Sequence, residues 1–351
     1  MRSGFANRTI RMLLDTEDEI FEAALPQDHS YRQLATQINW KKLIKILRKH
    51  YSEKGQTGYE VEQGFKAMLV QFWEDLSDRE IERALRENLV FKWFCGFGLK
   101  DKTPDHSYFG RLRDRLGEEK IAELFNQINN QLHAKGLVGE VFTFMDASKV
   151  ISKVHLWKER DQAIEDGYER LSNQVVDKYA TDKDARWGAK SKKDIWFGYK
   201  RNCSVDMRHG LISKTLITPA NVPDYKVVRE ISPRQGAVFA DKLYDTKETD
   251  VHLRARGLYP ATIRKNNNPI KNRDLDRWRS SIRMPFESTF SRLPRRARYR
   301  GLDKLQIQNY MECMVYNLKK AVRVLSTKPP PQQDYCVNYC YNGSKMLLQS
   351  T

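Results

Sequence analysis

Two short apolar stretches that end in aspartate decide the fold of this chain: VFTFMD at residues 141–146 and AVFAD at residues 237–241. Each has the length and the β-branched and aromatic content of a buried strand. An ionised carboxylate beside a buried strand is costly unless it is paired or binds a metal ion. Asp146 and Asp241 are therefore candidate metal ligands, although many aspartates at strand ends only start a turn or cap a helix.

The segments around these stretches predict a mixed α/β sheet. Residues 195–205 alternate between apolar and polar with a period of two, and a turn at 206–210 joins them to a second strand, 211–217, as a hairpin. The order of elements that follows is helix, strand, helix, strand and helix, with expected ranges of about 224–231, 237–241, 246–256, 258–264 and 301–325. This order fits a ribonuclease-H-like sheet whose central strand is 141–146. In such a sheet the strand of Asp241 lies beside it, so the two aspartates can be neighbours.

The N-terminal third predicts an all-helical domain at residues 29–138, after a mixed polar lead-in at 1–28. A capping box at Ser77 and Glu80 opens one of its helices. Thr103, followed by proline, is expected to cap another helix that stops before a glycine at position 117.

That last helix carries three arginines. Arg111 and Arg115 are four residues apart and project together, and Arg113 flanks them. The arrangement is typical of a helix in a helix-turn-helix unit that binds DNA. Ordinary solvated arginines explain the spacing equally well.

Composition points to a polyanionic partner. The 351 residues include 62 lysines and arginines against 45 acidic residues, a net charge of +17, and such an excess most often serves to neutralise phosphates. No stretch approaches the roughly 18 apolar residues of a membrane span. The five cysteines have no paired metal-ligand spacing, which favours free thiols in a reducing cytosol. Residues 151–193 are a highly charged insertion, and the proline-containing end, 327–351, is expected to be an extended or disordered tail.

Several short motifs resemble those of bacterial insertion-sequence transposases of the insertion-sequence-five group. The resemblance runs from about residue 30 to about residue 325. The motifs that carry it are LSDRE at 76–80, PDHS at 104–107, DARWG at 184–188, WFGYK at 196–200, TPAN at 218–221, ADK at 240–242 and RYRG at 298–301.

The resemblance implies a ribonuclease-H-like catalytic domain, residues 139–326, with an Asp-Asp-Glu triad at Asp146, Asp241 and Glu287. It also implies an arginine four residues before the glutamate, which is Arg283. Three carboxylates would hold two Mg²⁺ ions, or Mn²⁺, for cleavage at the ends of the element and transfer of the freed 3′-OH to target DNA. Two positions depart from the family pattern: Ser280 stands where a tyrosine is expected, and Pro294 where a basic residue is expected.

The departures leave two alternatives open. One is a protein that binds the element ends and has lost strand chemistry, and the other is a metal-dependent nuclease without strand transfer. The expected partners are double-stranded DNA, as terminal inverted repeats and as target, and further copies of the chain in a dimer or higher multimer. The expected location is the bacterial cytoplasm, at the nucleoid when bound to DNA. The candidate DNA-binding residues are Arg111, Arg113, Arg115, Arg186, Lys242, Arg292, Arg295, Arg298 and Arg300.

Overall fold

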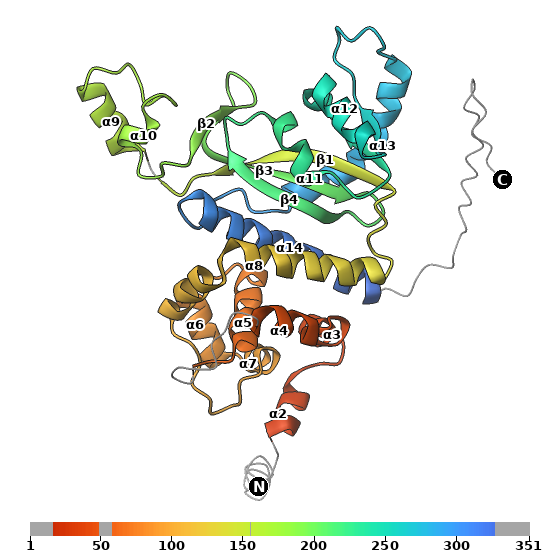
Figure 1. Ribbon diagram of the computed structural model, residues 1–351. Helices are drawn as coiled ribbons and strands as arrows, with labels where there is room; N and C mark the ends of the chain where they lie inside the picture. The colour runs from red at the N-terminus through yellow and green to blue at the C-terminus, as the bar shows by residue number, and fades with distance from the viewer. Residues whose placement is uncertain (1–16, 49–57, 155, 327–351) are drawn as a thin grey trace, which may run out of the picture.

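A six-stranded mixed sheet forms the centre of the C-terminal part of the molecule (Figure 1). The structure, a computed structural model, describes residues 17–48, 58–154 and 156–326. The strands are β1 (Phe142–Ile151), β2 (Arg186–Ala189), β3 (Ile195–Asp206), β4 (Leu211–Pro219), β5 (Ala237–Ala240) and β6 (Tyr259–Thr262). Their order is β2-β3-β1-β5-β6, and β4 pairs with the same edge of β3 as β2 does.

The topology confirms the predicted ribonuclease-H-like arrangement. β1 is central, antiparallel to β3 and parallel to β5, and β5 is parallel to β6. β3 and β4 form the predicted hairpin, whose turn ends at Gly210 with a φ of +66°, a conformation that glycine adopts without steric cost. The elements between the strands are η1 (Asp224–Val227), α11 (Val228–Ile231), η2 (Lys242–Tyr244) and α12 (Lys247–Ala255).

Helices cover both faces of the sheet, as the alternation along β1 and β5 requires. Phe144 and Phe239 face a core shared with α14 (Leu302–Ser326), whereas Met145 and Val238 pack among residues of α11 and α12. Asp146 follows Phe144 by two residues, so it projects on the α14 side. A second helix near this face is α13 (Arg273–Ser291), which packs against β1 and β6.

The N-terminal region is helical, as predicted, but its first helix, α2, lies inside the segment 1–28 that was predicted as a polar lead-in. It consists of α2 (Glu17–Ala24), α3 (Ser30–Gln37), α4 (Trp40–Arg48), α5 (Val61–Trp73), α6 (Asp78–Glu87), α7 (Leu89–Cys95) and α8 (His106–Ala134). The predicted capping box is present at the start of α6, where Ser77 and Glu80 exchange hydrogen bonds. Gly117 interrupts α8 with a φ of +65°, at the predicted break.

Two predicted boundaries are wrong. β1 does not end at Asp146 but runs on to Ile151, because residues 147–151 also pair with β3. The N-cap of α8 is Asp105 rather than Thr103, and its carboxylate accepts a hydrogen bond of 3.0 Å from the Tyr108 amide. A carboxylate is a stronger acceptor than a hydroxyl and adds a favourable interaction with the helix dipole.

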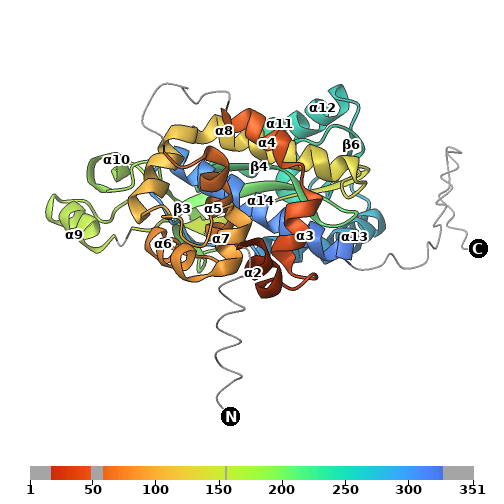
Figure 2. The ribbon, with the colours of Figure 1, turned by 90° about the horizontal axis from the view of Figure 1, so that it is seen from below.

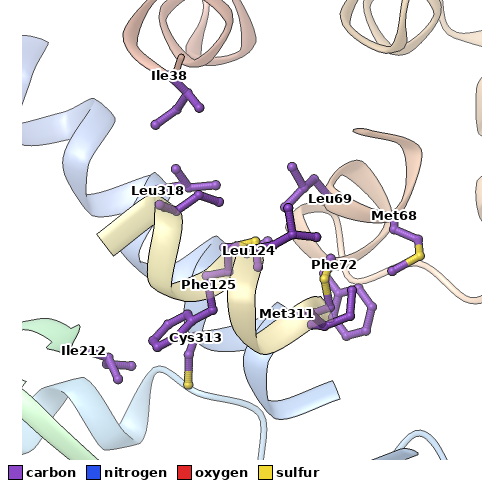
Figure 3. Packing of buried hydrophobic residues seen from close by; sticks show 14 of the residues in the cluster. Ile38, Met68, Leu69, Phe72, Leu124, Phe125, Ile212, Met311, Cys313 and Leu318 are labelled. Carbon is purple, nitrogen blue, oxygen red and sulfur yellow. The ribbon is translucent and has the colours of Figure 1, made fainter. Parts of the chain in front are cut away.

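One hydrophobic core continues from the helical region into the sheet. α14 packs against both α8 and β4, and it lies between the sheet and the smaller helices (Figures 1 and 2). Figure 3 shows Leu124 and Phe125 of α8 beside Met311 and Leu318 of α14, with Ile212 of β4 nearby. The change of secondary structure near residue 138 therefore does not interrupt the packing.

The charged insertion contains α9 (Trp157–Glu165), α10 (Val176–Tyr179) and β2. It extends to one side of the sheet (Figure 1). The predicted tail, 327–351, lies outside the described residues, as does most of the lead-in before α2. In the described part of the chain, no helix has the length and apolar character needed to cross a membrane.

Candidate active site

The register of β1 and β5 brings Asp146 and Asp241 together. The last paired residues of these parallel strands are Met145 and Ala240. The next residue on each strand is an aspartate, so the two carboxylates stand at adjacent positions on the same face. The sequence predicted that the two aspartates could be neighbours in this way.

The local partners of the two aspartates differ. Asp146 Oδ1 accepts a hydrogen bond of 2.8 Å from the Ala147 amide within β1. Asp241 ends β5 and caps the 3₁₀ helix η2, where its Oδ1 accepts a bond of 2.7 Å from the Leu243 amide. Asp241 therefore caps a helix, and its negative charge still acts on Asp146.

Burial raises the pKa of Asp146 to about 6. The Ala147 amide opposes this shift, and the negative charge of Asp241 adds to it. The positive charges of Lys190 and Arg283 lower the pKa of Asp146 again, which places both cations close to the carboxyl pair. Two carboxylates held together in this way favour either a shared proton or a bound cation.

The third predicted carboxylate does not join the pair. Glu287 lies on α13, where its side chain is half exposed and its Oε1 is 3.4 Å from Arg283 Nη2. Across residues 17–48, 58–154 and 156–326, no three acidic, histidine or cysteine side chains form a group that could hold a metal ion. The structure thus joins Asp146 to Asp241 and leaves Glu287 apart.

Arg283 connects α13 to the aspartates. Its guanidinium lies 5.5 Å from the centre of the Phe144 ring, on the face of β1 from which Asp146 also projects. The side chain is largely buried, and its Nε has no hydrogen-bond partner among the described residues. Pro285, between Arg283 and Glu287, lies inside the helix and cannot donate a backbone hydrogen bond there.

Three of the nine candidate DNA-binding residues bind other residues of the same chain. Arg113 is buried, pairs with Asp78 at 2.6 Å and stacks over Tyr299 at 4.6 Å. Arg298 binds the Leu76 carbonyl at 2.8 Å and the Asp75 carboxylate. These two arginines therefore join the catalytic region to α6 and the turn before it.

The third such residue is Arg186. It pairs with Asp177 at 2.8 Å and donates to backbone carbonyls, which holds β2 against α10. The spacing of arginines along a sequence does not reveal such carboxylate partners, because the partners lie on other elements of the fold.

The other six candidates are exposed: Arg111, Arg115, Lys242, Arg292, Arg295 and Arg300. Lys242 directly follows Asp241. The segment with Arg295 is fixed beside the end of β1, because the Ile151 amide binds the Arg295 carbonyl and the Ala297 amide binds the Ile151 carbonyl, both at 2.8 Å. The arginine run after α13 is thus attached to the strand that carries Asp146.

Sequence reasoning missed two residues near the aspartates. Lys190, at the end of the charged insertion, interacts electrostatically with Asp146. Tyr244 is fully buried, and burial together with the charges of Asp224, Asp146 and Asp241 raises its pKa. Tyr244 lies in η2, three residues after Asp241, whereas Lys190 follows β2 and is far from both aspartates in the sequence.

The raised pKa of Asp146 predicts a pH-dependent effect on stability. The folded-state pKa of about 6 is above the ordinary value of 3.8, so the folded wild type is penalised as pH rises through 6. Asp146→Asn removes that penalty. The free energies of unfolding of this variant and of the wild type are compared in buffer with chelator. The gain of the variant over the wild type should be about 1–2 kcal/mol larger at pH 7.5 than at pH 4.5.

Urea unfolding at the two pH values measures this difference. Asp274→Asn is the matched control, because the Asp274 side chain is 91% exposed on α13. An equal effect of Asp146→Asn at both pH values would contradict the assigned shift.

Comparisons with known proteins agree with the motifs. Residues 19–115 match a family described as a transposase domain (DUF772), and residues 165–318 match the transposase DDE domain. Asp241, Arg283 and Glu287 lie within the second match, and Asp146 precedes it.

One relative is the transposase for insertion sequence element IS1106 of Neisseria meningitidis serogroup B. It is 35% identical over 233 residues, which cover 62% of this chain and 79% of the relative. Among solved structures, a piggyBac transposase synaptic complex with hairpin DNA aligns at 9% identity with a TM-score of 0.38, over 84% of this chain and 74% of that one. The matches name no insertion-sequence-five group, so that narrower grouping stays a prediction.

Proposed function

Because the chain belongs to the DDE transposases of insertion sequences, we propose that it cuts DNA at the ends of such an element and joins the freed 3′-OH groups to target DNA. The adjacent pair Asp146 and Asp241 is the observation that supports this proposal most strongly. The proposed site also includes Arg283 and Glu287 on α13. Two ends must be brought together for this reaction, so we propose that two or more copies act on the DNA.

The aspartate pair fits a divalent cation. The raised pKa of Asp146 shows that its ionised form lacks sufficient compensation, and hard oxygen donors are what Mg²⁺ and Mn²⁺ prefer. When bound, such ions would stabilise the charge that develops on the attacking and leaving oxygens at phosphorus. Asp146 and Asp241 would hold them, and Glu287 would complete the set by leaving its contact with Arg283.

Arg283 and Lys242 would position the DNA backbone. Arg283 is close to Asp146 and keeps an unused Nε donor within the described structure. A guanidinium can bind a phosphate through two donors, which fixes its orientation. Lys242 is exposed and directly follows Asp241, so it can add a positive charge beside the scissile phosphate.

The exposed arginines after α13 would extend this contact along the DNA. Arg292, Arg295 and Arg300 are exposed, and the hydrogen bonds to Ile151 attach their segment to β1. Arg113, Arg186 and Arg298 are not part of the proposed surface, because each is used in a contact within the chain.

The test is a cleavage assay on the DNA that flanks the gene, made as duplexes that contain its terminal repeats. With Mg²⁺ or Mn²⁺, the purified protein should produce 3′-OH ends and then products joined to a second duplex. Binding of the ends without any cut would favour the alternative of an impaired end-binding protein, consistent with the separation of Glu287 from the aspartates. Cuts without joined products would favour a nuclease.

The exposed arginines of α8 predict a salt-dependent contribution to end binding. Arg111 is 66% exposed, and a phosphate contact there should reduce the salt slope of binding by about 1 when it is lost. Arg111→Ala and Arg115→Ala should therefore weaken binding of terminal-repeat duplexes at low salt. Fluorescence anisotropy across a salt series measures the slope.

Arg229→Ala is the control for these variants. Arg229 is on α11, at 67% exposure, and makes a 3.7 Å contact with Glu248. Unchanged slopes for both α8 variants would rule out a DNA contact by this helix.

A further inference from the structure

A basic groove lies between the end of α5, the second half of α14 and the segment that follows α13. Its volume is about 350 Å³, at the lower end of the range for binding sites. We refer to it as the α14 groove. Its lining includes two acidic side chains, Asp75 and Glu312, and five basic ones, Arg292, Arg298, Lys319, Lys320 and Arg323.

Both acidic side chains of the α14 groove are paired with arginines. Asp75 binds Arg298, which belongs to the lining itself. Glu312 is buried and binds Arg201 on β3, from outside the lining. Arg292 and the two lysines on α14 therefore receive no carboxylate from the lining, and the excess of positive charge favours a bound anion.

The two lysines of the α14 groove form hydrogen bonds with neutral groups. Lys319 Nζ donates to the carbonyl of Trp73, the last residue of α5, and lies 5.3 Å from the centre of its ring. Lys320 Nζ is 3.4 Å from the Tyr316 hydroxyl. Burial lowers the pKa of Lys319, and the charges of nearby acidic residues offset this shift only in part. An anion in the groove would stabilise the charged form of this lysine.

The α14 groove begins beside the proposed active site. Arg292 is the C-cap of α13 and follows Glu287 by five residues, about 7.5 Å along the helix axis. α14 is joined to α13 at this point, because the Tyr316 hydroxyl lies 3.2 Å from Thr289 Oγ1. The cations of the groove therefore lead from the end of α13 along α14 toward α5.

These cations are spread along the groove and do not converge on one point. Lys319 and Arg323 lie one turn apart on α14, whereas Arg292 lies at the end of α13. A single small anion needs donors that converge on it, whereas the phosphates of DNA repeat along the duplex. The arrangement therefore fits the backbone of a DNA duplex.

We propose that the α14 groove binds the phosphate backbone of the DNA duplex held at Asp146 and Asp241, a short distance from the cut. Lys319, Lys320 and Arg323 would contact its phosphates. This inference rests on the proposed function and adds to it a DNA-binding site that extends from the catalytic region to α5.

The test measures the salt dependence of DNA binding by fluorescence anisotropy, with the full-length wild type and the double variant Lys319→Gln with Lys320→Gln. Glutamine keeps a hydrogen-bond donor for the Trp73 carbonyl and removes the charge. On a long terminal-repeat duplex the double variant should bind roughly tenfold more weakly at low salt, and its salt slope should be smaller by about 2, because two phosphate contacts are lost.

The length and the sequence of the duplex identify which DNA occupies the α14 groove. When the terminal-repeat duplex is shortened stepwise toward the cut, from the end that reaches the groove, the difference between the double variant and the wild type should vanish. An unrelated duplex serves as target DNA. A loss of affinity confined to that duplex would assign the groove to the target, and a loss on the terminal-repeat duplex assigns it to the element end.

Three further variants complete the comparison. Lys319→Arg with Lys320→Arg keeps both charges and should keep the salt slope. Lys226→Gln is the matched control, because Lys226 is an exposed lysine in η1, whose Val227 packs on the opposite face of the sheet from α14. Arg323→Gln, on the exposed last turn of α14, should reduce the slope by about 1, and it tests the groove even if the double variant fails to fold.

Equal salt slopes for the wild type, the double glutamine variant and Arg323→Gln on every duplex would overturn the inference. So would an equal loss of slope in the arginine variant, since the lysines would then act through packing. A double glutamine variant that loses self-association and keeps its slope would overturn it as well, because an acidic surface of a second copy would then occupy the groove. Normal cleavage without any effect of the groove variants would remove only the groove. Slope changes without cleavage would retain the groove and remove the proposed function, and failure to bind any duplex would overturn both.

Discussion

If the proposed function is right, Asp146→Asn and Asp241→Asn should each lower the rate of strand cleavage by on the order of 10³-fold or more, because several kcal/mol of transition-state stabilisation would depend on the cations that both carboxylates are proposed to hold. Asparagine keeps the size of each side chain and removes the charge. Asp146 and Asp241 follow the last paired residues of β1 and β5, so loss of either leaves a single carboxylate in the site. Neither change should weaken binding of the element ends, since the exposed arginines are proposed to supply that contact.

Single-turnover cleavage of a terminal-repeat duplex with Mn²⁺ measures this effect, and anisotropy on the same duplex measures binding. Asp274→Asn, an exposed change on α13, should cut like the wild type. Glu287→Gln is the informative comparison, because Glu287 contacts Arg283 and not the aspartates. A loss as large as that of the aspartate variants would mean that Glu287 moves into the site when DNA and cation bind. Full cleavage by both aspartate variants would exclude them from the chemistry.

Five of the six strands could be predicted because they depend on local patterns, whereas β2 lies in the segment that was predicted as a charged insertion and was missed. The alternation along residues 195–217 predicts a hairpin, and the order of elements fits a ribonuclease-H-like sheet in which the strands of Asp146 and Asp241 are neighbours. The register then places Asp146 beside Asp241 without any further information. The end of β1 could not be predicted in the same way, because residues 147–151 are held in the strand by pairing with β3.

The partners of long charged side chains could not be predicted from the sequence. Arg113 and Arg298 looked like surface arginines, yet Asp78 and Asp75 bind them from a segment that is 35 residues from Arg113 and 223 from Arg298. The position of Glu287 relative to the aspartates also depends on long-range packing. Its position on a helix was predictable, but its distance from the aspartates depends on how α13 packs on β1 and β6.

The same long-range packing creates a buried ion pair that supports the region after α13. Arg201 on β3 and Glu312 on α14 are paired, with side chains that are 1% and 3% exposed. Arg201 also donates to Asn309 Oδ1 at 2.8 Å and to the Pro294 carbonyl at 3.0 Å. Arg201 thus fixes the backbone at Pro294, between the exposed Arg292 and Arg295.

Glu312→Ala should lower the free energy of unfolding by about 3–5 kcal/mol, because it leaves the Arg201 charge buried without its counter-charge. Urea unfolding at neutral pH measures this loss. Glu248→Ala is the control, since Glu248 is 59% exposed and 3.7 Å from Arg229, and it should change stability by less than about 1 kcal/mol. The double variant Arg201→Met with Glu312→Leu should recover much of the loss, because apolar side chains of similar size need no counter-charge. A Glu312→Ala protein as stable as the wild type would show that water or another acceptor reaches Arg201, and the arginine run would then depend on other contacts for its position.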